Sequence, residues 1–247
     1  MKKKVIKEPP VILALDDSRV LYLDNHLLIA NKPAGTLTQG DASGDLDFHN
    51  MAKIYVKEKF EKPGKVFLAL VHRLDRPVSG VMVFPRTSKA AARVTQQFKQ
   101  RSIEKRYIAM VEGHLTGSET LINHVWKDHR RVRVVQEGHP KGLRAELTYN
   151  VLAIEGKRTL VDIKLATGRP HQIRVQLANI GHPVIGDFRY HAKTELDGRN
   201  LGLHSYLLRL EHPTKQERMG WTAMPPDSWG NVFKEQIRDL LKARSKE

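Results

Sequence analysis

The chain of 247 residues contains no cysteine. Disulfide scaffolds, thiolate metal sites, iron–sulfur clusters and cysteine nucleophiles all require sulfur and are therefore excluded. No apolar run approaches the roughly 20 residues that a membrane-spanning helix requires. The start, MKKKVIKEPP, is basic but lacks the apolar stretch of a secretory signal peptide. The sequence thus predicts a cytoplasmic protein without a membrane partner.

Acidic residues are scarce relative to basic ones. The chain has 27 Asp and Glu against 42 Lys and Arg, which gives a formal net charge of +15 with histidines neutral. Such a surplus favours polyanionic partners, and nucleic acid before an anionic membrane. The basic side chains gather in residues 86–106 and 127–144. Clustering of this kind is typical of phosphate binding, because affinity scales with the number of phosphates neutralised.

Several common catalytic motifs are also missing. The chain has no GxxxxGK[ST] phosphate loop, no GxGxxG fingerprint and no HExxH zinc motif. Nucleotide hydrolysis is therefore disfavoured, as is zinc-dependent base deamination, which needs cysteine ligands. The histidines also show no recognisable metal-binding pattern.

The apolar pattern predicts an α+β fold. Many predicted strands follow one another directly along the chain, so antiparallel pairing should dominate. We expect one domain over residues 19–247, preceded by a basic arm over residues 1–18 and without a separate N-terminal RNA-binding domain. Strands are expected in residues 19–35, 80–87, 105–113, 121–129, 131–138, 144–154 and 160–167. Helices are expected near residues 47–60, 87–101 and 170–180 and after residue 227.

The segment HRLDRPVSG, residues 72–80, is the strongest candidate for chemistry. It lies between two apolar runs, residues 66–71 and 81–84, which we expect to be buried strands, and it presents Asp75 with Arg73 and Arg76 on either side. Nearby positive charge favours the ionised form of a carboxylate, which can then act as a nucleophile or a base. The competing interpretation is a salt-bridged turn residue with a purely structural role.

HRLDRPVSGVMV resembles the signature of the RluA-type pseudouridine synthases. Four further segments resemble motifs of that family, and they occur in family order from residue 20 to about residue 226. The resemblance implies the pseudouridine synthase catalytic fold, a mixed and mainly antiparallel β-sheet flanked by helices and loops. It also implies isomerisation of a specific uridine in RNA without a cofactor. The segments are NKPAG (31–35), EKRYIAMVEG (104–113), TGRPHQIRVQLANIGHPVIGD (167–187) and GLHSYLLRLEHP (202–213).

The resemblance also implies roles for individual residues. Asp75 corresponds to the catalytic aspartate, Tyr107 to the ring beneath the uracil, and Arg174 to the arginine that pairs with the catalytic carboxylate. Arg73 corresponds to the residue that occupies the space left by the flipped base. The residues expected to contact RNA are Arg73, Arg76, Lys32, Lys105, Arg106, Arg169 and His171.

Some alternatives stay open at the level of sequence. Asp75 could attack the anomeric carbon of the ribose or abstract a sugar proton to give a glycal. The substrate is expected to be structured RNA, with ribosomal RNA favoured and transfer RNA as the second choice, and nothing requires more than a monomer. The family often has valine and histidine where this chain has Thr38-Gln39-Gly40. The competing functions are a non-catalytic RNA-binding or chaperone protein and a base-flipping hydrolase that releases uracil.

Overall fold

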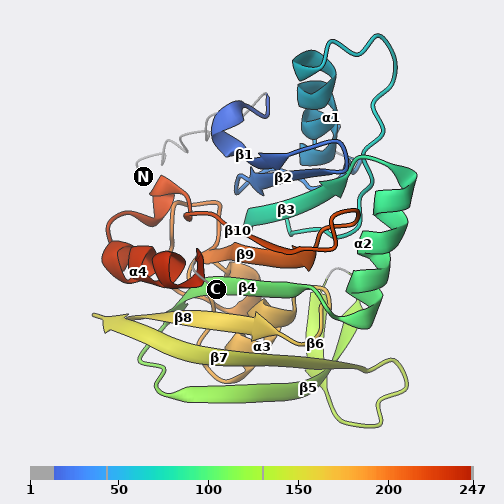
Figure 1. Ribbon diagram of the computed structural model, residues 1–247. Helices are drawn as coiled ribbons and strands as arrows, with labels where there is room; N and C mark the ends of the chain where they lie inside the picture. Colours follow the sequence, from blue (N-terminus) through green and yellow to red (C-terminus); the bar gives the residue numbers. More distant parts are fainter. Residues whose placement is uncertain (1–13, 43, 130, 246–247) are drawn as a thin grey trace.

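The computed structural model describes residues 14–42, 44–129 and 131–245. One mixed sheet of ten strands runs through this part of the chain, in the order β1-β2-β3-β9-β4-β8-β7-β5-β6, with β10 paired to β9 (Figure 1). The strands are β1 (Val20–Leu23), β2 (Leu27–Lys32), β3 (Ser79–Pro85), β4 (Glu104–Glu112), β5 (Ser118–Asp128), β6 (Arg131–Val135), β7 (Leu143–Glu155), β8 (Arg158–Leu165), β9 (Leu203–Glu211) and β10 (Arg218–Thr222).

Among the described strands only β3 and β9 pair in parallel, so the expected α+β fold with a mainly antiparallel sheet is confirmed. Most sequence neighbours pair as hairpins, as the turn residues predicted. In the first hairpin Asp24 Oδ1 accepts hydrogen bonds from the backbone N–H of His26 and of Leu27, both at 2.8 Å. That side chain satisfies the turn and fixes the register of β1 against β2.

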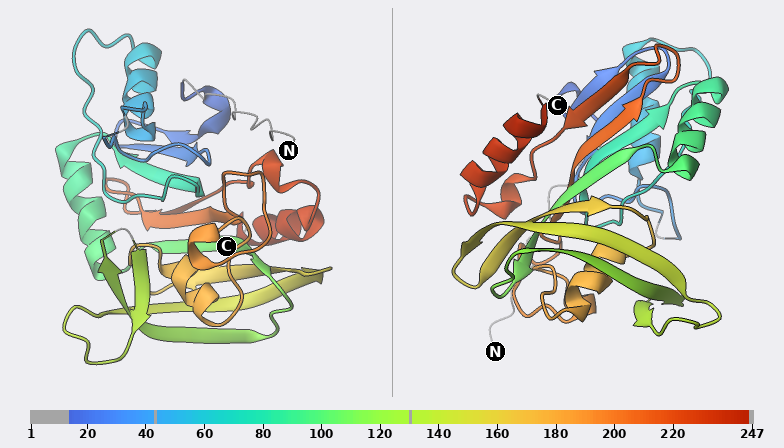
Figure 2. Two further views of the ribbon diagram at one scale, coloured as in Figure 1. Left: turned by 180° about the vertical axis from the view of Figure 1, so that it is seen from behind. Right: turned by 60° about the horizontal axis from the view of Figure 1, so that its bottom comes forward.

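Helices cover both faces of the sheet. On one face α1 (Phe48–Lys59) and α3 (Gln172–Asn179) pack on the apolar cluster that contains Met82 and Ala109. On the other face α2 (Ser88–Gln100) packs against Val83, and α4 (Lys234–Ser245) packs against Ile108. Figure 2 shows α3 and α4 on opposite sides of the strands. Within the described residues, no helix is long and apolar enough to cross a lipid bilayer.

Helix ends follow the expected capping chemistry. Thr87 caps α2 through a bond from the Ala90 N–H to its side chain, and Gly181, at φ +86°, follows α3 in the left-handed conformation that suits a C′ residue. The predicted start of α3 at Pro170 was too early. His171 has φ +51°, so the helix begins only at Gln172. The strand expected at residues 66–71 does not form, and β10, which pairs with β9, was not predicted.

The predicted basic arm is only partly described, because residues 1–13 lie outside the described residues. Residues 14–18 lie against the fold. Leu15 is buried, and Asp17 begins the 3-10 helix η1 (Asp17–Arg19). The Asp17 carboxylate pairs with Lys59 Nζ at 2.6 Å and accepts a hydrogen bond from Tyr55 Oη, both from α1.

The parallel pair β3 and β9 sets the position of the candidate site. Ser79 lies opposite His204 on β9, and His204 in turn lies opposite Ile108 on β4. The segment HRLDRP ends at Pro77, one residue before β3 begins. It therefore meets the start of β4, which carries Tyr107, although the two are far apart in sequence.

Candidate active site

A cavity of about 740 Å³ opens beside the start of β4, on the face that α1 and α3 cover. This volume lies within the usual range for small-molecule sites, about 300–1,000 Å³. The cavity wall combines apolar side chains such as Leu74 and Leu203 with charged groups from distant segments. The predicted site residues that line it are Asp75, Tyr107, Arg174, Arg73, Arg76, Arg169 and His171.

The turn that carries Asp75 is fixed by Thr38. The Thr38 hydroxyl donates to the Leu74 carbonyl at 2.7 Å and accepts from the Leu74 N–H at 3.1 Å. Val78 N–H donates to the Asp75 carbonyl at 3.0 Å and closes the turn. Thr38 is buried, and it lines the cavity together with Gln39 and Gly40. The Thr38-Gln39-Gly40 departure therefore has a structural role next to Asp75.

Lys32 stabilises the same turn through hydrogen bonds to backbone carbonyls. Its Nζ donates to the carbonyl oxygens of Pro33 at 3.0 Å, Thr36 at 2.7 Å and Arg76 at 3.3 Å. These three acceptors match the three N–H bonds of an ammonium group. Burial lowers the pKa of Lys32 to about 7. Lys32 is fully buried, so its prediction as an RNA contact was wrong: its ammonium holds the loop together.

Arg76 ties the NKPAG loop to the Asp75 turn. Its Nε donates to the Gly35 carbonyl at 3.0 Å, and the Gly35 N–H donates back to the Arg76 carbonyl at 2.8 Å. Its Nη2 pairs with Asp45 at 2.6 Å. Arg76 thus lines the cavity but does not neutralise Asp75, although it follows Asp75 directly in sequence.

The cation that holds Asp75 is Arg174, which comes from α3. Its Nη1 lies 2.9 Å from Asp75 Oδ2. Its Nε and Nη2 bind the two oxygens of Asp187 at 2.6 and 2.8 Å. The Asp187 side chain is 1% exposed and that of Arg174 6%, while that of Asp75 is 33% exposed. A buried carboxylate therefore orients the guanidinium, and the guanidinium orients the accessible carboxylate.

His171 stands beside Asp75. Burial lowers its pKa, which favours the neutral ring. The Val132 N–H donates to Tyr190 Oη at 3.2 Å, and Tyr190 Oη lies 2.8 Å from His171 Nδ1. His171 Nε2 lies 3.6 Å from Asp75 Oδ2.

Tyr107 supplies an aromatic surface at the base of the cavity. It lies on β4, its residue is only 8% exposed, and it belongs to the apolar cluster beneath α3. Burial raises the pKa of Tyr107 to about 12, so the phenol stays protonated. The ring is neutral and flat, which suits contact with a planar base.

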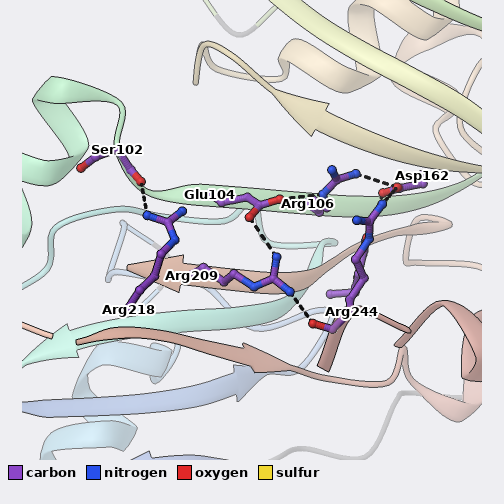
Figure 3. A network of polar contacts seen from close by, with 8 residues as sticks. Ser102, Glu104, Arg106, Asp162, Arg209, Arg218 and Arg244 are labelled. Carbon is purple, nitrogen blue, oxygen red and sulfur yellow. Dashed lines mark hydrogen bonds and ion pairs between the residues drawn. The ribbon is translucent and has the colours of Figure 1, made fainter. Parts of the chain in front are cut away.

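The remaining predicted RNA contacts divide by face. Arg73 is exposed and Arg169 partly exposed, and both line the cavity as well as an adjoining groove. Lys105 lines only the groove. Arg106 was wrongly predicted as an RNA contact. It points to the opposite face of the sheet, where it pairs with Glu104 and Asp162, both at 2.8 Å (Figure 3).

The two basic stretches also divide between structural and accessible roles. Arg86 donates to the Asp24 carbonyl and stacks 4.6 Å from the Phe60 ring centroid, and Arg93 donates to the Pro213 carbonyl. In contrast, Lys127 lines the cavity, and Arg101 lines the adjoining groove. Part of the positive charge thus stabilises the fold, and part surrounds the site.

Comparison with known proteins decides the family. The sequence model of the RNA pseudouridylate synthase family matches residues 26–179, which include Asp75, Tyr107 and Arg174. The chain belongs to this family. As a pseudouridine synthase it is an isomerase, and the RluA-type resemblance is confirmed. The matched segment ends before Asp187, which clamps Arg174.

Relatives and solved structures extend the match over most of the synthase. This chain is 34% identical to the dual-specificity RNA pseudouridine synthase RluA of Haemophilus influenzae, over 87% of its own length and 95% of that protein. It is 31% identical to ribosomal large subunit pseudouridine synthase C of Vibrio vulnificus, over 87% of this chain and 73% of that protein. The structure of human RNA pseudouridylate synthase domain containing 4 has the same fold, with a TM-score of 0.74 and 23% identity, over 90% of this chain and 93% of that one.

Two residues of the synthase site, Asp187 and Tyr190, were not predicted from the sequence, and the role of Thr38 had been left open. Asp187 lies at the end of the segment 167–187 that carried the family resemblance, and it follows a glycine. That position is a weak signal, because only its contact with Arg174 distinguishes it from a surface aspartate.

Proposed function

We propose that the synthase converts a uridine of structured RNA to pseudouridine and that Asp75 is its catalytic residue. The observation that carries this proposal is the Asp75 carboxylate at the cavity wall, one oxygen of which is bound by Arg174 Nη1 at 2.9 Å. Among the described residues none donates a hydrogen bond to Oδ1. Oδ1 is therefore available to react.

The reaction is an isomerisation in which atoms and protons balance within the nucleotide. The bond between N1 of uracil and C1′ of ribose breaks, uracil turns in the cavity, and C5 bonds to C1′. The proton lost from C5 is matched by the proton gained at N1. Water must be kept from C1′ during this exchange, because a carboxylate beside a sugar otherwise supports hydrolysis. The flat Tyr107 ring below the base and the tightly held Arg174 serve that requirement.

Two routes use the same oxygen of Asp75: attack on C1′, and abstraction of the C2′ proton to give a glycal. RNA that carries deuterium at C2′ of the target uridine separates them. A severalfold lower rate with the labelled RNA indicates proton abstraction, and an unchanged rate indicates attack on C1′.

The uridine must leave its stack to reach Asp75. Unstacking a base costs a few kcal/mol and is least costly in loops and bulges. We propose that Arg73, which is exposed at the edge of the cavity, occupies the space that the flipped base leaves. Arg169 and His171 then contact the displaced nucleotide. In this proposal the catalytic domain spans residues 19–247.

The favoured substrate is ribosomal RNA. The Vibrio vulnificus relative is named a ribosomal large subunit enzyme, and the Haemophilus influenzae relative is named dual-specificity. Transfer RNA is the second candidate. Pseudouridine mapping in total RNA from cells with and without the gene tests this. Loss of a ribosomal site supports the proposal, and loss of no site in either RNA class contradicts it.

Asp75→Asn tests the catalytic role, because it keeps the shape of the side chain and removes the reactive charge. We expect no detectable pseudouridine with the purified variant, together with RNA affinity close to that of the parent. The matched control is Asp227→Asn, which changes an exposed aspartate of η3 (Asp227–Trp229) and should retain the parent rate. An unchanged yield with Asp75→Asn would refute the mechanism. Free uracil with an abasic RNA product would indicate a hydrolase, and RNA binding without conversion by the parent would indicate a non-catalytic protein.

A further inference from the structure

A second groove adjoins the catalytic cavity. It has a volume of about 870 Å³ and lies between the start of β4, the end of α2 and the segment after β8. The residues that line both the cavity and the groove are Arg73, Tyr107, Leu165, Gly168 and Arg169. A strand of RNA that enters the cavity at Tyr107 can therefore continue directly into the groove.

The groove is lined with cations whose charge is not cancelled. Its carboxylates are Glu104 and Glu146. Glu104 pairs with Arg106 at 2.8 Å and with Arg209 at 3.1 Å, as Figure 3 shows, and Glu146 pairs with Arg144 at 2.5 Å. Both are thus already neutralised by arginines that do not line the groove. The cations that do line it are Arg73, Arg101, Lys105, Lys164, Arg169 and Arg218.

Lys105 differs from the other cations because it is partly buried without an acceptor. Among the described residues none accepts a hydrogen bond or forms an ion pair with its Nζ, which lies 5.6 Å from the Phe98 ring centroid. Burial lowers the pKa of Lys105, with no carboxylate nearby to oppose the shift. A Cβ added at Gly168 would lie 3.3 Å from this Nζ, so the glycine leaves room beside the ammonium. A desolvated ammonium with three free N–H bonds is a ready anion site.

The groove wall next to Lys105 is aromatic and uncharged. The rings of His72 and Phe98 stack with centroids 5.2 Å apart and planes at 28°. The Val83 N–H donates to His72 Nε2 at 3.0 Å, and burial lowers the pKa of His72 to about 3, so the imidazole stays neutral. A cation beside a neutral aromatic wall suits a nucleotide, whose phosphate and base need these two environments.

We propose that this groove holds the RNA strand immediately next to the target uridine and that Lys105 Nζ binds one phosphate of that strand. The proposal rests on the proposed function, since it takes the uridine to occupy the cavity. It assigns to Lys105 the positioning of the strand on one side of the flipped nucleotide. The chemistry stays with Asp75.

Neutral backbone linkages test the proposal directly. Hairpin RNAs with a single uridine in the loop are made with one methylphosphonate linkage each, at successive positions on both sides of the uridine. Binding is measured with the Asp75→Asn protein, which leaves the RNA unconverted, with and without Lys105→Met. We expect Lys105→Met to weaken binding of unmodified RNA about tenfold, the scale of a hydrogen bond to a charged group. We also expect it to lower the slope of log affinity against log salt by about 1.

The decisive readout is the dependence on position. The parent in this comparison is the protein with Asp75→Asn alone. It should lose affinity at one linkage within two nucleotides of the uridine, and the added Lys105→Met change should show no further loss at that linkage. Lys105→Arg, which keeps the charge, should retain the loss. The matched control is Lys157→Met in the exposed turn between β7 and β8, which should behave like the parent at every linkage.

Three results overturn the proposal. One is an equal loss at every linkage in the parent and in Lys105→Met, and another is no linkage effect in the parent. The third is that Lys105→Met weakens the binding of inorganic phosphate but leaves RNA binding unchanged, which would indicate a site for free anions. Pseudouridine formation by the protein with native Asp75 is measured in parallel. Its absence refutes the proposed function, whereas the linkage scan reports on the groove alone.

Discussion

Among single residues, the buried carboxylate of Asp187 matters more for the position of Asp75 than the arginines next to Asp75 in sequence. Arg174 uses Nε and Nη2 on Asp187 and keeps Nη1 for Asp75. A two-bond contact between guanidinium and carboxylate fixes the plane of the guanidinium. The position of the Asp75 oxygen is therefore set two contacts away, at a residue that does not line the cavity.

Asp187→Asn should separate orientation from substrate binding. The amide cannot accept both N–H bonds of Arg174, so Nη1 moves and Asp75 is misplaced. A misplacement of about 1 Å costs on the order of 100-fold in rate, so we expect kcat to fall by that factor with KM nearly unchanged. Steady-state pseudouridine formation measures both constants. Asp187→Glu should recover part of the rate, and a drop confined to KM would contradict the positioning role.

At the scale of elements, the parallel contact between β3 and β9 joins the β1-β2-β3 part of the sheet to the rest. Gly80 lies opposite Ser205 in this contact, with φ +136°. A Cβ at Gly80 would lie 2.4 Å from the Ser205 carbonyl oxygen, which is backbone and cannot turn away. The strands approach closely here because Gly80 has no side chain, and the HRLDRP turn that precedes β3 is held in place with them.

Gly80→Ala should therefore destabilise the protein, by about 3 kcal/mol, the upper range for overpacking in a core. The clash falls on backbone, and the alanine would also have to adopt a left-handed φ. Urea unfolding measures the loss. Gly64→Ala is the matched control, since Gly64 has an ordinary φ and no atom within 4 Å of the added Cβ. Equal stability of the two variants would show that the strands can separate without cost.

At the scale of the whole molecule, buried neutral histidines make the fold sensitive to acid. His204 Nδ1 lies 2.8 Å from Ser79 Oγ, and His204 Nε2 lies 2.9 Å from the Ala223 carbonyl oxygen. Burial lowers the pKa of His204 to about 4. A histidine in the unfolded chain titrates near pH 6.5, roughly the model-peptide value. Between these values the unfolded state binds more protons, so the stability that neutral His204 contributes is lost as pH falls.

His204→Gln should remove much of this acid sensitivity, because glutamine can donate to Ala223 and accept from Ser79 but cannot gain a proton. From pH 7.5 to pH 4.5 the parent should lose about 2 kcal/mol more free energy of unfolding than the variant, from the linkage between pKa and stability. Urea unfolding of both proteins at the two pH values gives this difference. His72 is present in both proteins, so its own titration contributes equally to both losses and cancels in the difference. Identical losses in parent and variant would mean that His204 does not titrate in this range.

Much of the site was predictable from sequence because its main residues each lie in a short, ordered motif. Asp75, Tyr107 and Arg174 line one cavity, as the motifs predicted. The predictions for Lys32 and Arg106 failed because a basic residue has the same appearance in sequence whether it binds phosphate, three carbonyls or a buried carboxylate. The β10 segment, RMGWT, was missed because its short apolar pattern becomes a strand only when β9 is beside it.

Amino-acid sequence alone accounts for the excess of positive charge, the absence of thiols, and the alternation that makes most of these segments strands. These properties depend on composition and on local periodicity. The partner of each charge depends instead on how the chain folds. Arg174 meets Asp75 across 99 residues of chain, while Arg76, the next residue after Asp75, turns to Asp45. Strand order and sheet face determine such pairs, because neighbouring residues on a strand point to opposite faces and distant segments meet across it.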